Sequence, residues 1–261
     1  MVFQNNLLMA SASTGGVFQD LGGCYFDGST YYVKTSDWTG LADGKIGTLS
    51  CWSRQDSASD GSHAAIYPFQ NLNGTMFLYM VTGNTMLIGL YGSSGYAWQV
   101  RTAVDSFKST EGWLHFVASW DVENTVGHLY VNGVSSQATV VTAPNDQLID
   151  YTRGKWGIGV SAYLNYGPYI GDMAQFYFNP EEYVDLSVAA NLAKFYNGGP
   201  VDLGSDGSTP TGTAPIYFMN RTATGAVTEF DTNAGTGGDA NLTLTGTLTA
   251  SSNIPFPGLV A

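Results

Sequence analysis

Two stretches decide the fold of this chain: Trp113-Leu-His-Phe-Val-Ala-Ser-Trp120 and, after a short loop, His128-Leu-Tyr-Val-Asn-Gly-Val134. Apolar and polar residues alternate in both, which is the pattern of half-buried β-strands. Asn132-Gly133 supplies the pair of positive-φ residues that a tight type I′ hairpin turn requires. One face of the two predicted strands carries the apolar side chains of Leu114, Phe116, Ala118, Trp120, Leu129 and Val131.

The composition also favours an all-β protein. The chain has 261 residues, of which 44% are hydrophobic, so it is long enough for one large core. Charged residues make up only 11%, while 33 glycines and 16 tyrosines favour strands joined by tight turns. All-β sandwiches commonly reach this length as one domain.

The charge excludes one class of partner. Nine basic residues against 21 acidic ones give a formal net charge of −12. Binding to a phosphate backbone requires clustered lysine and arginine, which the sequence lacks, so we expect no nucleic-acid partner. The acidity is expected to keep the protein soluble, and it leaves cations as candidate ligands.

Targeting and redox features indicate a protein made in a cytoplasm. The first basic residue is Lys34, and Asn6-Leu-Leu-Met-Ala10 is too short for a secretory signal. We expect no signal peptide and no membrane span. Cys24 and Cys51, the only thiols, are interpreted as small buried residues, with a disulfide as the alternative.

The remaining pattern predicts a sandwich of short strands. Gly, Asn, Asp and Ser punctuate apolar runs at intervals of roughly 8–15 residues, which is typical of a sandwich or jelly roll. Further strands are predicted at 24–28, 31–33, 47–53, 64–67, 75–81, 85–91, 98–102, 156–159 and 169–178. We divide the chain into an N-terminal arm (1–22), a jelly roll (23–198) and a connector with a C-terminal β extension (199–261).

One helix and three late strands complete this organisation. Asp185 or Ser187 can cap a helix that carries Val188, Leu192 and Phe195 on one stripe and stops at Asn197-Gly-Gly199. In the extension, strands are predicted at 216–219, 227–231 and 241–249. These strands are expected to complete the sheet or to form a small lobe on it.

From Cys24 to Tyr196 the order of features resembles the laminin-G-like and concanavalin-A-like superfamily. The segments that carry the resemblance are Tyr-Phe-Asp-Gly-Ser (25–29), Thr-Leu-Ser-Cys-Trp (48–52), Gly-Trp-Leu-His-Phe-Val-Ala-Ser-Trp-Asp (112–121), Leu-Tyr-Val-Asn-Gly-Val (129–134) and Tyr-Ile-Gly-Asp-Met-Ala-Gln-Phe-Tyr-Phe (169–178). The resemblance implies an all-β, antiparallel β-sandwich jelly roll with one short helix.

The two ends resemble laminin-G-type proteins encoded by tailed bacteriophages. The similar segments are Asn-Asn-Leu-Leu-Met-Ala (5–10), Pro-Val-Asp-Leu-Gly-Ser-Asp-Gly-Ser-Thr-Pro-Thr-Gly-Thr-Ala-Pro (200–215) and Thr-Asn-Ala-Gly-Thr-Gly-Gly-Asp-Ala-Asn-Leu-Thr-Leu-Thr-Gly (232–246). This resemblance implies a virion component such as a capsid-surface decoration, a fibre or a tail protein.

Enzymes with this fold cleave glycans with paired carboxylates. Glu229-Phe-Asp231 would place two carboxylates on one strand face, but the further Glu of the family motif is missing at Asn233 or Ala234. Asp121-Val-Glu123 is a second pair, in a loop that leaves a strand. We therefore predict no enzymatic activity and no catalytic residues.

The histidines do not indicate a catalytic site or a metal site either. His63, His115 and His128 are the only histidines. His115 and His128 are predicted on neighbouring strands, on the face opposite Leu114 and Leu129, where they can be close to each other, and no spacing suggests zinc. We expect no cofactor. Many laminin-G domains bind calcium at the sandwich rim, so the resemblance leaves Ca²⁺ as an alternative, with candidate ligands Asp27, Asp121 and Asp172.

Two aromatic loops are candidates for carbohydrate binding, because sugar C–H faces stack on aromatic rings and nearby amides orient the sugar. The alternative is that these rings cover core edges or form subunit contacts. The loops span 91–98 and 163–169, and the candidate residues are Tyr91, Tyr96, Trp98, Tyr163, Asn165 and Tyr166.

The leading hypothesis is a non-enzymatic bacteriophage virion structural protein. Its expected partners are other virion proteins, bound through the arm, and further copies of itself as a homo-oligomer. It is expected in the virion, after synthesis in the host cytoplasm. The alternative is a carbohydrate-binding module that recognises a host-surface polysaccharide, and a glycan-degrading enzyme is the third hypothesis.

Overall fold

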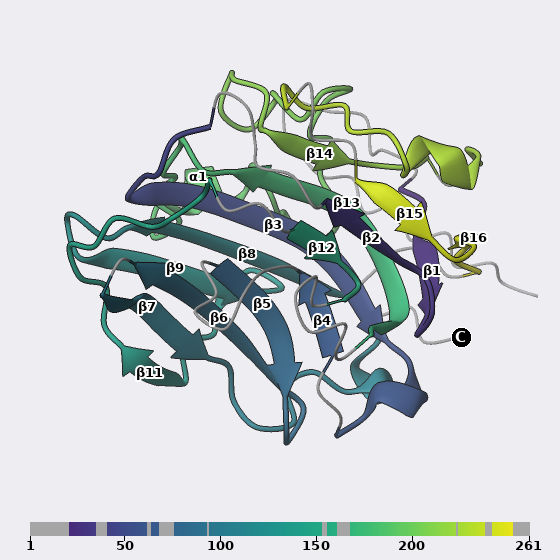
Figure 1. The fold of residues 1–261 in the computed structure, drawn as a ribbon, viewed down its shortest axis with the longest axis horizontal. Coiled ribbons are helices and arrows are strands. Elements are labelled where there is room, and N and C mark those ends of the chain that lie inside the picture. The colour runs from purple at the N-terminus through teal and green to yellow at the C-terminus, as the bar shows by residue number, and fades with distance from the viewer. Residues whose placement is uncertain are drawn as a thin grey trace, which may run out of the picture.

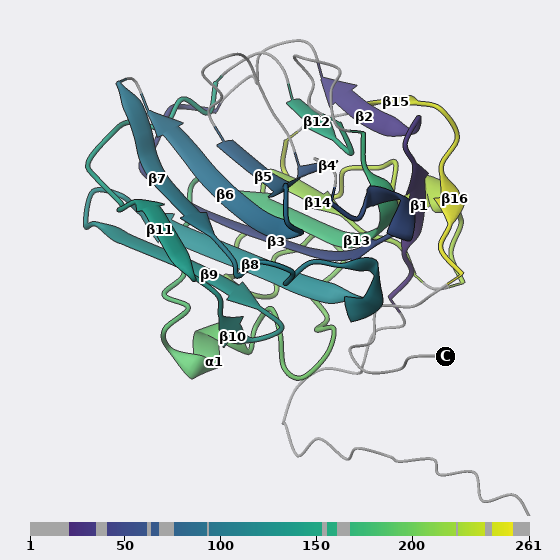
Figure 2. The same cartoon turned by 90° about the horizontal axis from the view of Figure 1, so that it is seen from below.

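The protein is a β-sandwich built from three antiparallel sheets (Figure 1). This computed structural model describes residues 21–34, 41–61, 64–67, 76–92, 94–152, 156–160, 168–222, 224–237 and 242–252. An eight-stranded sheet forms one layer of the sandwich. A five-stranded and a three-stranded sheet lie over it (Figure 2). The predicted jelly-roll class of fold is confirmed.

The eight-stranded sheet runs in the order β10-β9-β8-β3-β13-β1-β16, and β14 also pairs with β13. The strands that decided the fold, β8 and β9, are neighbours in it, as the sequence predicted. The bounds are β1 Cys24–Asp27, β3 Ile46–Gln55, β8 Leu114–Asp121, β9 Val126–Val131, β10 Val134–Ser135, β13 Ile170–Asn179, β14 Tyr217–Met219 and β16 Thr249–Ala250.

The opposing layer has two parts. The five-stranded sheet runs in the order β11-β7-β6-β5-β4, and the three-stranded sheet in the order β12-β2-β15. The bounds are β2 Tyr31–Lys34, β4 Ala64–Tyr67, β5 Met76–Val81, β6 Thr85–Gly92, β7 Gly95–Arg101, β11 Thr139–Thr142, β12 Trp156–Ile158 and β15 Thr243–Thr245. Three short 3₁₀ helices among the described residues are η1 Ser57–Ser59, η2 Ser109–Glu111 and η3 Val227–Glu229.

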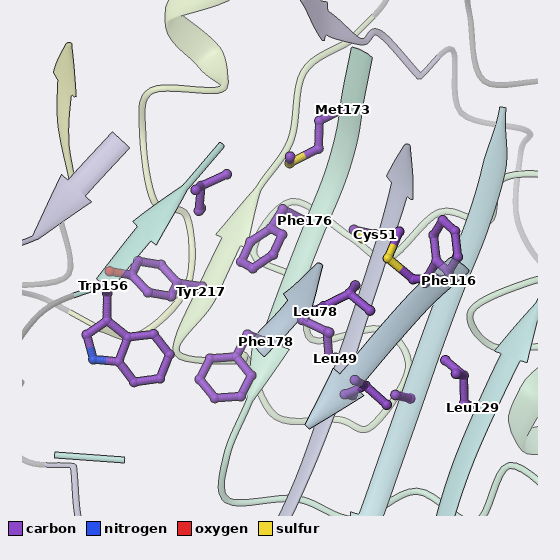
Figure 3. Packing of buried hydrophobic residues seen from close by; sticks show 14 of the residues in the cluster. Leu49, Cys51, Leu78, Phe116, Leu129, Trp156, Met173, Phe176, Phe178 and Tyr217 are labelled. Atoms are coloured by element: carbon purple, nitrogen blue, oxygen red, sulfur yellow. The ribbon is translucent and has the colours of Figure 1, made fainter. Parts of the chain in front are cut away.

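The main core lies between the layers and is filled by strand residues that point inward (Figure 3). The predicted alternation is confirmed, because Leu114, Phe116, Ala118, Trp120 and Leu129 all belong to this core and Val131 packs against it. Burying such side chains supplies the main favourable free energy of folding. Cys24 and Cys51 are also buried, and both are free thiols, so the alternative of a disulfide is wrong.

The turn after β9 has the predicted geometry. Asn132 has φ +47° and Gly133 has φ +75°, which are the two positive values of a type I′ turn. The Asn132 side chain also accepts a hydrogen bond from the backbone N–H of His115 at 2.8 Å. This contact fixes the turn against the neighbouring strand β8.

A second apolar cluster lies on the outer face of the eight-stranded sheet, where Val117 and Tyr177 contact residues of the 184–203 segment. Helix α1, Ala189–Leu192, lies on this side, away from β5–β7 (Figure 2). It is shorter than predicted, and its N-cap is Val188. Asp185 instead accepts hydrogen bonds from the N–H and hydroxyl of Ser187, which holds the preceding segment in a turn.

The C-terminal extension is part of the sandwich. Strands β14, β15 and β16 pair with β13, β2 and β1 respectively. The buried side chains of Tyr217, Met219, Phe230 and Leu248 enter the main core. At the other end, Leu21 is buried against Trp52 and Trp113, so the last residues of the predicted arm lie on the folded body, and residues 1–20 fall outside the described part.

Two predictions for this extension are corrected. Residues 227–229 form η3 and not a strand, because turn hydrogen bonds run from Glu229 N to Ala226 O and from Phe230 N to Val227 O. The predicted strand 241–249 is divided into β15 and β16 by Gly246, whose φ is +85°. Leu248 is buried as expected, and Leu242 and Leu244 are partly buried.

Candidate carbohydrate-binding site

Tyr91 and Tyr96 form a cross-strand pair at the end of the β6–β7 hairpin. Their ring centroids lie 5.0 Å apart at an interplanar angle of 75°, an edge-to-face contact that favours a fixed mutual orientation. Leu90 and Trp98, one register step away, belong to the main core. Because successive strand residues point to opposite faces, the tyrosine pair lies on the outer face of the five-stranded sheet.

The segment 145–149 holds this hairpin from the side. The Asn145 side-chain amide donates a hydrogen bond to the Tyr96 carbonyl at 3.0 Å, and the Gln147 amide donates to the same carbonyl at 3.4 Å. Gln147 Oε1 accepts hydrogen bonds from the N–H and the hydroxyl of Ser94 at 3.2 and 3.0 Å. The backbone that carries the tyrosine pair is therefore fixed by side-chain amides.

A glycine makes this close approach feasible. Gly92 ends β6 and forms a β-bridge with Ile149. A Cβ atom at position 92 would lie 2.6 Å from the Cβ of Gln147, which is shorter than any normal contact. Any larger residue at this position would push Gln147 away from the hairpin.

Charged side chains border the same rim of the sandwich. The Lys45 ammonium lies 2.5 Å from a carboxylate oxygen of Asp146 and 3.5 Å from one of Glu123. The hydrogen bond that Lys45 donates to the Asp146 carboxylate is the main cause of the raised pKa of Lys45. The two carboxylates are largely exposed, so this edge of the candidate site is acidic.

The predicted site residues differ in their exposure to solvent. Tyr96 is 37% exposed and Tyr91 is partly exposed, so both rings are accessible to a ligand. Trp98 is 0% exposed and packs on Gly127, so its prediction as a stacking platform is wrong. A β-bulge at this point of β7 turns Tyr96 outward and Trp98 inward. Tyr163, Asn165 and Tyr166 lie outside the described residues.

Sequence reasoning missed Ser94, Asn145 and Gln147 as supporting residues. Pro144-Asn-Asp-Gln147 shows only a polar run after a strand, a signal for a loop. This run contacts the β6–β7 hairpin, which lies about 50 residues earlier in the sequence. The contact depends on the path of β11 and of the segment that follows it.

The aspartates considered for calcium have local partners. Asp27 accepts hydrogen bonds from the N–H and hydroxyl of Ser29 and from the N–H of Thr30, which lower its pKa to about 2. Asp121 accepts two from Asn124. Burial raises the pKa of Asp172, whose carboxylate lies 2.9 Å from Arg54 Nε. Among the described residues no group of three His, Cys, Asp or Glu side chains could hold a metal ion.

The carboxylates of the two candidate pairs are engaged by neighbouring side chains and backbone groups. Glu229 accepts hydrogen bonds from the N–H and hydroxyl of Thr222, and Asp231 accepts one from the Tyr32 hydroxyl. Because η3 replaces the predicted strand, the expectation that these two carboxylates share a strand face is wrong. Asp121 is bound to Asn124 and Glu123 to Lys45, so the second pair is also engaged.

The two histidines of β8 and β9 are far apart. His128 is in register with Ser119, four residues along β8 from His115, which corresponds to about 13 Å. His115 is fully buried, and its Nε2 lies 2.8 Å from the Ser50 hydroxyl. Burial lowers its pKa to about 3. His128 contacts the Tyr183 hydroxyl at 3.0 Å instead, so the expectation that the histidines lie close together is wrong.

No helix within the described ranges is long and apolar enough to cross a membrane.

Comparisons with known proteins agree with the sandwich architecture. A family model of the Concanavalin A-like lectin/glucanases superfamily matches residues 27–181. A search of curated protein sequences found no significant match.

One solved structure has the same fold at low sequence identity, and two others are similar over smaller parts of this chain. A protein of Bacteroides ovatus, named as a candidate carbohydrate-binding protein, aligns over 90% of this chain with 13% identity and a TM-score of 0.59; the chain covers 62% of its length. A heptameric SAP-like pentraxin of Limulus polyphemus aligns over 68% of this chain and 84% of its own, with 12% identity and a TM-score of 0.48. Domains LG4-5 of the mouse laminin α1 chain align over 69% of this chain and 46% of their own, with 16% identity and a TM-score of 0.46.

The family match covers more than half of the chain, and it includes the strands β3, β8, β9 and β13 that form the centre of the eight-stranded sheet. The chain therefore belongs to the concanavalin A-like lectin/glucanases superfamily.

Proposed function

We propose that this chain is a non-enzymatic module that binds glycans through the tyrosine pair of the β6–β7 hairpin. The observation that carries the proposal is the exposed edge-to-face pair of Tyr91 and Tyr96. An aromatic ring that presents part of its face to solvent can stack on the apolar C–H face of a pyranose. The pair is held in place before a ligand arrives, which reduces the entropy lost on binding.

The groups around the pair add the polar contacts that a sugar requires. Ser94 is exposed, and Asn145 and Gln147 are partly exposed, beside the Tyr96 backbone. Hydroxyl, amide and carboxylate groups beside an aromatic platform orient sugar hydroxyls by hydrogen bonding. Asp146, between the two amides in sequence, supplies an exposed carboxylate acceptor at the same rim.

Family and fold support the same class of function. The matched superfamily contains lectins, and the Bacteroides ovatus protein with the same fold is named as a candidate carbohydrate-binding protein. The fold alone does not assign a ligand, so the proposal depends on the hairpin site.

The proposal excludes catalysis because a glycosidase requires an accessible pair of carboxyl groups, one of them with a raised pKa. Asp172 is the described carboxyl group with a raised pKa, and it is buried against Arg54. It cannot reach a glycan on the outer face of the five-stranded sheet.

A glycan array followed by calorimetry tests the proposal. Tyr96→Ala should weaken binding of the best glycan about tenfold, with a larger loss in the Tyr91→Ala/Tyr96→Ala double variant. Tyr25→Ala, at a partly exposed tyrosine of β1 on the other layer, serves as the matched control. The proposal fails if no glycan binds, or if the tyrosine-pair variants bind as well as the control.

A second candidate function is that of a structural protein of a tailed-bacteriophage virion. It is supported by the resemblance of residues 5–10, 200–215 and 232–246 to laminin-G-type phage proteins. In that setting the glycan would be a host-surface polysaccharide, and residues 1–20 would attach the domain to other virion subunits.

Removal of residues 1–20 tests the second function. The shortened protein should keep the melting temperature of the full chain but fail to join assembled particles. Incorporation of the shortened protein at the normal copy number would contradict attachment through this segment.

A further inference from the structure

Strands β10 and β11 are the terminal strands of the two large sheets, and they lie on the same side of the molecule (Figure 2). Within the described residues, β10 pairs only with β9, and β11 pairs only with β7. Three residues, 136–138, join the two strands, so their facing ends are at most about 14 Å apart. Among the described residues, no further strand closes the sandwich along this side.

Exposed valines line this side. Val134 is 67% exposed, Val140 52% and Val141 47%. Val140 is in register with the core residue Val100, and Val134 with Val131, which packs against the core. The apolar inner layer thus continues to the edge of the sandwich and reaches solvent there. Sheet edges of monomeric proteins are usually protected by charged side chains such as lysine, or by proline, and these two strands have neither.

The charge distribution favours a second copy of this chain as the partner. Residues 124–145 contain no Asp, Glu, Lys or Arg, although the chain carries a formal charge of −12. Two copies repel each other wherever acidic surfaces meet, so an uncharged edge is the surface on which they approach most easily.

We propose that this valine edge, Val134, Val140 and Val141, is the contact surface between two copies of this chain. A two-fold axis places the same apolar patch on both sides, which makes the contact self-complementary. The β-bulge between Val140 and Thr142 interrupts the ladder at the free edge. The contact is therefore made by side chains and not by a long added strand.

The small area of the valine edge indicates that the dimer is weak. A stable specific interface buries about 800 Å² on each partner, more than three valine side chains supply. Association is therefore expected near millimolar concentration in dilute solution. It becomes effective where many copies are held together on one support.

Sedimentation equilibrium of the full chain up to about 1 mM tests this proposal. The average mass should rise from 27.8 kDa toward twice that value. In Val140→Lys/Val141→Lys, the dimer dissociation constant should rise about tenfold or more, because charge is placed on the apolar contact. Val104→Lys is the matched control, since Val104 is 73% exposed in the loop after β7 and should leave association unchanged.

Salt and a second variant complete the test. Added NaCl should strengthen the dimer, because it screens the repulsion between two acidic chains without weakening an apolar contact. Val134→Lys, on the other sheet, should weaken association too, and it replaces the β11 variant if thermal melting shows that variant to be unfolded. A chain that stays monomeric, association that salt weakens, or equal effects of Val104→Lys and the edge variants would each overturn the proposal.

Discussion

The hydroxyl of Tyr32 donates a hydrogen bond to the carboxylate of Asp231, although the two residues are 199 positions apart in sequence. Tyr32 lies in β2 at the centre of the three-stranded sheet, and Asp231 lies two residues after η3 in the C-terminal extension. Phe230 packs at 6.3 Å from the Tyr32 ring and at 6.5 Å from the ring of Phe26. Aromatic burial and this hydrogen bond together fasten the extension to the sandwich.

Tyr32→Phe should lower the free energy of unfolding by about 1–3 kcal/mol, because it leaves the Asp231 carboxylate without this donor. Urea denaturation measures the change. Tyr31→Phe, on the neighbouring residue of β2, is the control, because Tyr31 makes no hydrogen bond with the described residues through its hydroxyl and should change stability by less than about 0.5 kcal/mol. Equal losses in both variants would contradict the role of the Tyr32–Asp231 bond.

A chain that ends at residue 198 should not fold. It loses β14, β15 and β16, and with them the buried side chains of Tyr217, Phe230 and Leu248. Exposing several large apolar side chains costs an amount comparable with the whole stability of a typical domain, about 5–15 kcal/mol. Circular dichroism and dye binding to exposed apolar surface would show the loss; a cooperative melting transition of the shortened chain would contradict it.

Acid should destabilise the protein through His115. Burial lowers the pKa of this imidazole to about 3, while the unfolded chain has the ordinary value near 6.5. Between these values the unfolded state binds one more proton than the folded state. Stability therefore falls as pH decreases below about 6.5, by at most about 1.4 kcal/mol per pH unit from this residue.

His115→Gln should remove that part of the pH dependence, which urea titrations between about pH 7 and pH 4 would measure. His128→Gln is the control and should change the slope less. Burial lowers the pKa of His128, but the Asp185 carboxylate raises it. An unchanged slope in His115→Gln would show that His115 does not titrate in this way.

Gly127→Ala should destabilise the protein by about 1–3 kcal/mol through overpacking. The added methyl group would lie 2.6 Å from the Trp98 ring, which fills the space over β9. The double variant Gly127→Ala/Trp98→Phe should recover part of this loss relative to Trp98→Phe alone, because the smaller ring leaves room for the methyl group. Differential scanning calorimetry of the four proteins in this cycle measures the coupling, and strict additivity would contradict a direct contact.

The core strands were predictable because their signal is local. Trp113–Trp120 and His128–Val134 show on their own which side chains are buried, since a strand alternates its faces. The Asn132-Gly133 turn was equally predictable, because its two positive φ values depend on the residues themselves.

The extension and the helix were harder to predict. Val227–Asp231 was predicted as a strand, yet residues 227–229 form a 3₁₀ turn, with Phe230 buried in the core and Asp231 bonded to Tyr32. The helix expected from Asp185 is reduced to Ala189–Leu192, since Asp185 forms a local turn with Ser187. In both cases a contact distant in sequence, or a competing local hydrogen bond, overrode the pattern.

Part of the candidate site, too, could be predicted from the sequence, and part depended on the tertiary structure. The sequence by itself predicted an aromatic loop at 91–98 between two strands, because turn and strand preferences are encoded in neighbouring positions; in the structure β6 and β7 extend into it as a hairpin. Only the tertiary structure decided that Tyr96 faces solvent while Trp98 is buried, because one bulge residue shifts the alternation of the strand. It also brought Asn145 and Gln147 to the hairpin, since such contacts follow from the packing of whole sheets and not from the spacing of residues along the chain.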